Sequence, residues 1–100
     1  MITLTNYTDA QLAEMAGIGS KACIAMANAV LVEEFADSLP VSVARSMPDA
    51  IAQFVWDARR DEAVKVLADA VRNPVNIKHE ALRLDVIQEV LLFEHAEAHL

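Results

Sequence analysis

Apolar residues recur along this chain every three or four positions, the spacing that places side chains on one face of an α-helix. The clearest early example follows Ser20, a residue type that often caps the N-terminus of a helix. Beyond it, Ile24, Ala27, Leu31 and Phe35 fall on one face. This pattern predicts a helix from position 20 to about position 37.

Helix-start signals occur at three other places. Thr8 and Gln11 have the spacing of a capping box, which predicts a short helix that ends near Gly17 and Gly19. Pro40 suits the first turn of a short helix that reaches about position 47. Pro48 starts another helix in the same way.

The segment 48–73 is helical in pattern throughout, but its apolar stripe changes sides. The stripe before Arg60 and the stripe that begins at Val64 point in opposite directions. The helix either breaks around Arg60 and Asp61, or continues and packs on both sides. Because neither Gly nor Pro interrupts the segment, we predict one long or kinked helix.

After the stop signal at Asn73 and Pro74, a last helix is predicted from about Asn76 to near the C-terminus. It carries two apolar stripes, one of Leu82, Val86, Val90 and Phe93 and one of Leu84, Ile87 and Leu91. A helix that is apolar on two sides is a central core helix or a subunit contact. The pattern therefore predicts an all-α fold, with residues 1–100 forming one domain and a compact bundle of four to six helices.

The composition favours the same fold and adds a strong negative charge. Hydrophobic residues make up 55% of the chain, which has only 2 Gly and 3 Pro. The 15 acidic residues outnumber the 8 Lys and Arg, so the net charge is −7. This charge repels phosphate backbones and anionic membranes, and it favours basic protein partners, including proteins that grip nucleic acid. The alternative is that the charge only keeps an apolar surface in solution.

Neither a disulfide nor a membrane span is expected. Cys23 is the only cysteine, which fits a reducing, cytoplasmic location. The first residues do not form a secretion signal, and the apolar stretch 22–32 is much shorter than the roughly 20 residues that span a bilayer.

Residues 12–26 resemble the helix–hairpin–helix family, in which a hydrophobic-x-Gly-hydrophobic-Gly hairpin joins two helices and binds a DNA phosphate. The resemblance implies that Gly17 and Gly19 supply backbone amides, that Ile18 fills the core and that Lys21 flanks the phosphate. The chain has Ala16 where that family usually has proline, and its second helix lacks further basic residues. A Gly-containing turn between packed helices is the favoured interpretation, and a helix-turn-helix is a weaker one.

Two clusters of carboxylates and one aromatic residue are candidate contacts for a protein partner. The clusters are Glu33, Glu34 and Asp37, and Asp57, Asp61 and Glu62. On predicted polar faces they are solvated charge, or else a patch for Lys and Arg on a partner. Trp56, the single tryptophan, is an exposed binding anchor if the helix breaks near Arg60 and a core residue if it continues.

No pattern of catalytic or metal-binding residues is evident. Ser, His and Asp do not have the spacing of a nucleophile elbow, and there is no phosphate-binding loop or dinucleotide fingerprint. His95 and His99 share a helix face, but the favoured interpretation is a pair of solvated histidines at a helix C-terminus. We therefore expect no enzyme activity, no metal and no cofactor.

In size, acidity and helix content, the chain resembles small phage-encoded proteins, in particular the anti-CRISPR proteins. That resemblance implies an inhibitor or adaptor that binds a bacterial CRISPR effector complex and blocks its nucleic-acid surface. Its acidic clusters would then meet Lys and Arg sites. Two alternatives stay open: a helix–hairpin–helix module that binds DNA non-specifically, and a non-catalytic homo-oligomeric subunit such as a homodimer.

Overall fold

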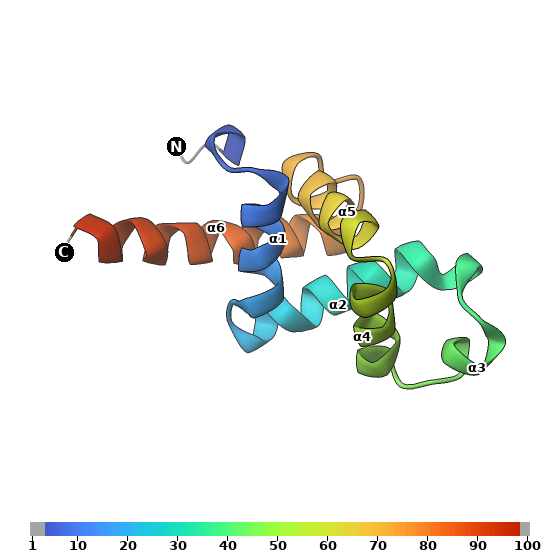
Figure 1. Ribbon diagram of the computed structural model, residues 1–100. Helices are drawn as coiled ribbons and strands as arrows, with labels where there is room; N and C mark the ends of the chain where they lie inside the picture. Colours follow the sequence, from blue (N-terminus) through green and yellow to red (C-terminus); the bar gives the residue numbers. More distant parts are fainter. Residues whose placement is uncertain (1–3, 99–100) are drawn as a thin grey trace.

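The computed structural model describes residues 4–98, and for Ile18 and residues 96–98 it describes the backbone alone. Six α-helices and two short 3-10 helices account for this part of the chain, which contains no strand (Figure 1). The all-α prediction is therefore confirmed. The α-helices are α1 (Asp9–Ile18), α2 (Lys21–Phe35), α3 (Val41–Ala44), α4 (Pro48–Ala58), α5 (Arg60–Arg72) and α6 (Ile77–Ala98); the 3-10 helices are η1 (Leu4–Asn6) and η2 (Ala36–Ser38).

Helix α6 runs along the long axis of the molecule, and α1 crosses it (Figure 1). Helices α1, α2 and α5 all pack against α6, and α4 packs against α2. Side chains from five of these helices meet in one core, whose largest fully buried members include Leu12, Val30, Val55, Leu67 and Leu82. The described residues measure 48 × 26 × 21 Å, and the C-terminal part of α6 extends well beyond α1.

Three of the predicted helix starts are confirmed by side-chain hydrogen bonds. The Gln11 backbone N–H donates to Thr8 Oγ1 at 3.2 Å, and the Thr8 N–H donates to Gln11 Oε1 at 2.8 Å, which completes a capping box. Ser20 caps α2 by accepting the Cys23 N–H. Asn76 caps α6 by accepting the His79 N–H at 2.9 Å. Pro48 is the first residue of α4, as its fixed φ favours.

The prediction of one helix over 48–73 is wrong, because the chain breaks at Arg59. This residue has φ −135° and ψ 46°, outside the helical region, and it separates α4 from α5. The break turns both apolar stripes inward, so that Val55 of α4 and Leu67 of α5 are both buried. Two straight helices bury both stripes in a single core, whereas one continuous helix would need a core on each side.

Only one of the two stripes on α6 is covered. Leu82, Val86 and Val90 are fully buried against the other helices. Phe93 continues their line but is 49% exposed. Leu84 and Leu91, on the opposite face, remain exposed. The helix is therefore a core helix on one side and has a bare apolar face on the other.

Among the described residues, no single helix is apolar over enough length to cross a membrane. The segments Asp9–Gly17 and Lys21–Ser38 reach the length and hydrophobicity of a membrane span only when they are taken together, and a bend of 115° separates them.

Candidate protein-binding site

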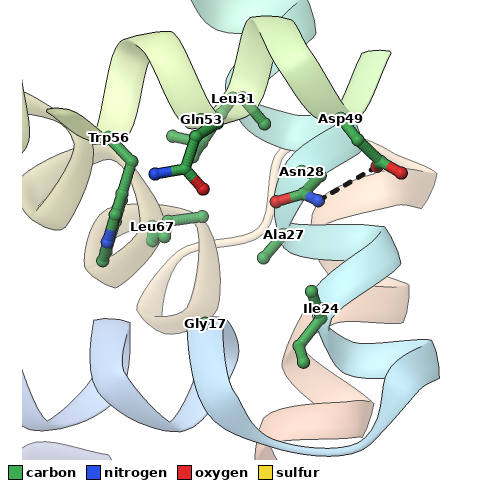
Figure 2. Close-up of a pocket in the computed structure, with 10 residues that line it drawn as sticks. Gly17, Ile24, Ala27, Asn28, Leu31, Asp49, Gln53, Trp56 and Leu67 are labelled. Carbon is green, nitrogen blue, oxygen red and sulfur yellow. Dashed lines mark hydrogen bonds between the residues drawn. The ribbon is translucent and has the colours of Figure 1, made fainter. Parts of the chain in front are cut away.

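Trp56 lies at the surface between two hollows, one of which is shown in Figure 2. Its side chain is half-buried and packs against the core, so it is neither fully exposed nor a true core residue. The ring faces Gly17 of α1, where a methyl group in place of hydrogen would be 3.8 Å from Trp56 Cζ2. The absence of a side chain at Gly17 lets α1 approach the edge of the indole closely. The Arg60 guanidinium lies 5.3 Å from the ring centroid, within cation–π range.

One hollow is a cavity of about 190 Å³ that follows α4. Asp49, Gln53 and Trp56 line it from α4, at a spacing that places them on one helix face. Ile24, Ala27 and Asn28 line it from α2, and Leu31 and Leu67 supply further apolar surface. Asn28 Nδ2 donates to Asp49 Oδ1 at 3.3 Å, as the dashed line in Figure 2 marks.

The second hollow, about 320 Å³, lies between α1 and α5. Glu14 is its acidic residue, Arg60 its basic one, and Ala10, Ala13 and Val64 are apolar. Trp56 and Gly17 line both hollows, so the indole lies between the two. We call this pair of hollows the Trp56 groove. Apolar walls, an aromatic anchor and carboxylates at Asp49 and Glu14 suit an aliphatic or basic side chain of another protein.

The carboxylates at the junction of α4 and α5 are exposed but partly engaged within the chain. Asp57 accepts a hydrogen bond from Gln53 Nε2 at 2.9 Å, and Glu62 accepts one from Arg59 Nε at 3.1 Å. The Arg59 contact lowers the pKa of Glu62 below its usual value, and the same contact raises the pKa of Arg59. Asp57 continues the surface of α4 just beyond Trp56, and Asp61 lies in the first turn of α5.

Three carboxylates, Glu33 and Glu34 at the end of α2 and Asp37 in η2, lie beside different neighbours. Glu33 pairs with Lys78 of α6, which lowers the pKa of Glu33, first through the hydrogen bond and then through the charge. Glu34 lines a shallow surface hollow with residues of α5 and the start of α6. Asp37 precedes Ser38, whose hydroxyl accepts a hydrogen bond from Arg59 Nη1 at 2.7 Å. Arg59 therefore contacts both Glu62 and Ser38, the residue after Asp37, whereas Glu33 pairs with Lys78 of α6.

The glycines of the helix–hairpin–helix resemblance occupy unequal positions. Gly17 lies inside α1, and Gly19 caps that helix with φ −72° and ψ −147°. The next residue, Ser20, donates its backbone N–H to Glu89 Oε1 at 3.0 Å. A methyl group on Gly19 would come within 2.6 Å of the Met15 carbonyl oxygen and 2.9 Å of the Glu89 side chain. Glycine is therefore required at 19 because Glu89 and Met15 approach so closely.

Glu89 thus holds the place at the N-terminus of α2 where the resemblance puts a DNA phosphate. A phosphate could bind there only by displacing this carboxylate, and Lys21 is the one nearby cation that the resemblance offers. No local pattern indicates this role of Glu89, because Glu89 and Ser20 are 69 residues apart along the chain. Burial, with the nearby charges of Asp85 and Glu89, raises the pKa of Cys23 to about 11.

Of the paired histidines, His99 lies outside the described residues and His95 is exposed. Within residues 4–98, no three His, Cys, Asp or Glu side chains are grouped as metal ligands. Comparison of the chain with protein families, with curated proteins and with solved structures finds no match.

Proposed function

We propose that this chain is a small non-catalytic protein-binding inhibitor or adaptor, and that it engages a basic protein surface through the Trp56 groove. The observation that carries the proposal is the half-buried Trp56, which is flanked by two hollows and lies beside Gly17. Tryptophan is enriched at the centres of protein interfaces, because it supplies a large rigid contact area at low entropic cost.

Charge selects the kind of partner. Asp49 lies in the groove, Asp57 lies next to Trp56, and the chain as a whole carries −7. Such a surface attracts Lys and Arg side chains and speeds their approach at low salt. Proteins that grip nucleic acid present such side chains. The resemblance in size, acidity and helix content to anti-CRISPR proteins supports a CRISPR effector complex as the first partner to test.

The test is co-elution of the purified chain with reconstituted CRISPR effector complexes in size-exclusion chromatography, followed by a gel-shift assay of target DNA binding. We expect a stable complex that excludes the DNA. Asp49→Asn should weaken it by about threefold to tenfold, because the change removes one charge and keeps the shape of the side chain. Asp69→Asn is the matched control, since Asp69 is exposed on α5 outside the groove.

Two outcomes contradict the proposal. Failure to bind any of the complexes removes this class of partner. Binding that Asp49→Asn and Asp69→Asn weaken equally would mean that overall charge, rather than the Trp56 groove, makes the contact. Because Trp56→Ala removes a side chain that packs on the core, its thermal unfolding must be measured beside its binding.

A further inference from the structure

Helix α6 presents an unpaired apolar face to solvent. Ile77, Leu84 and Leu91 are 85%, 57% and 50% exposed, and each lies seven residues from the next. Seven residues make nearly two turns, so the three side chains form a line along the helix, with the half-buried Ile87 beside it. Apolar residues at heptad spacing are the pattern by which one helix packs along another. None of the described helices covers this line.

We propose that this face binds the same face of a second copy of the chain, with the two α6 helices antiparallel. A two-fold axis passing between Ile87 and Gln88 places Leu84 of each copy opposite Leu91 of the other, because the two leucines are equally distant from that axis. Every contact is then made twice, as in other isologous dimers. The projecting end of α6 packs along its counterpart in place of being surrounded by water.

The charges of α6 favour this orientation and a second copy as the occupant. Lys78 and Arg83 lie in its first half, whereas the residues from Asp85 onward include carboxylates and neither Lys nor Arg. The first half also contains Glu80 and Asp85, so it is close to neutral, whereas the second half contains Glu89, Glu94 and Glu97. Antiparallel packing therefore sets the nearly neutral half of one helix, which includes Arg83, beside the acidic half of the other. A parallel pair would instead set Glu80 against Glu80 and Glu94 against Glu94.

One flank of the apolar line supplies a specific pair. Arg83 and Glu94 lie on the same side of α6, and the two-fold axis places Arg83 of each copy opposite Leu92 of the other, two residues from Glu94 and about 3 Å from it along the helix. Within its own chain, Glu94 also accepts a hydrogen bond from the Tyr7 hydroxyl at 2.8 Å. Arg83 Nε is buried and has no hydrogen-bond partner among the described residues. A buried donor without an acceptor is rare in folded proteins. Because Nε is buried within the chain, a carboxylate of the second copy would pair with the terminal nitrogens of this guanidinium.

Sedimentation equilibrium and light scattering over a range of concentrations test the proposal. We expect a mass of twice 10.9 kDa, falling toward the monomer on dilution. Leu84→Asp or Leu91→Asp should weaken association by at least about tenfold to a hundredfold, while circular dichroism remains helical because both side chains are exposed. Val41→Asp is the matched control: it adds the same charge at an apolar residue of α3 that is also exposed, and should leave the mass unchanged.

Charge exchange tests the orientation. Arg83→Glu should favour the monomer, and the double variant Arg83→Glu with Glu94→Arg should restore the dimer. Gln88→Cys, next to the axis, should give a disulfide-linked dimer on mild oxidation, and the buried Cys23 should not compete. A monomer mass at concentrations near about 1 mM overturns the proposal. So does a dimer that is indifferent to Leu84→Asp and Leu91→Asp, or one that the charge exchange fails to restore.

Discussion

The two glycines near the first interhelical turn offer a sharp test of the packing, because alanine should have opposite effects at the two positions. Gly17 lies inside α1, where alanine is favoured over glycine by roughly 0.5–1 kcal/mol. The added methyl group would meet the Trp56 ring at 3.8 Å, an ordinary van der Waals distance. Gly17→Ala should therefore raise the free energy of unfolding by about that amount.

Gly19→Ala, in contrast, should lower the free energy of unfolding. The same methyl group at Gly19 would lie 2.6 Å from the Met15 carbonyl oxygen and 2.9 Å from two carbons of Glu89. The Met15 oxygen belongs to the backbone of α1 and cannot swing away as a side chain does. Overpacking of this kind costs about 1–3 kcal/mol, which corresponds to a fall in Tm of several degrees in a domain of this size.

Urea unfolding followed by far-UV circular dichroism measures both effects on one scale. Glu89→Ala, alone and combined with Gly19→Ala, completes a double-mutant cycle. Since Glu89 accounts for part of the crowding, the cost of Gly19→Ala should shrink in the Glu89→Ala background and remain above zero because of Met15. If Gly19→Ala proves as stable as the native chain, or Gly17→Ala is the more damaging of the two, the packing described around Ser20 and Glu89 is refuted.

Three further predictions concern the core, the buried thiol and one surface ion pair. Leu82→Ala should cost about 2–5 kcal/mol in urea unfolding, because Leu82 is fully buried, whereas Leu92→Ala on the exposed face should change stability by less than about 0.5 kcal/mol. The folded-state pKa of Cys23 is raised from its ordinary 9.0 to about 11, so the unfolded chain loses this proton first. The free energy of unfolding should therefore fall as pH rises from 9 to 11. Urea titrations at successive pH values should show a smaller fall for Cys23→Ala, which has no thiol to titrate. The pKa of Glu33 is lowered by Lys78, so the pair's contribution is present above the unfolded pKa and is lost as pH falls; in an NMR titration, Lys78→Gln should raise the pKa of Glu33, and an unchanged value would mean that the ion pair is absent in solution.

Local signals in the sequence were sufficient to locate most helix starts. Thr8 with Gln11, Ser20, Asn76 and Pro48 all act as expected, because capping depends on residues within one turn. The break at Arg59 was harder to predict, since neither Gly nor Pro marks it. The useful signal was the change of side in the apolar stripe, which outweighs the absence of a helix-breaking residue.

The site could be predicted only in part. Trp56 and the acidic residues near it were evident as candidates, but their arrangement depends on α1, α2 and α4 meeting in space. The same limit applies to Glu89 at the start of α2 and to Lys78 beside Glu33, which are paired across 69 and 45 residues. No local pattern carries such contacts, because they exist only once the core has assembled.

The corner that contains α3 has a consequence for handling the protein. Residues 40–47 are exposed almost throughout, and the one-turn helix α3 lies apart from the main core (Figure 1). Since α2 and α4 are held together by their own packing, lengthening the connection between them costs little, about 0.6 kcal/mol for each doubling of a flexible loop. An affinity tag or fluorescent label can therefore be inserted here, away from the Trp56 ring and from α6, while the chain termini stay unmodified.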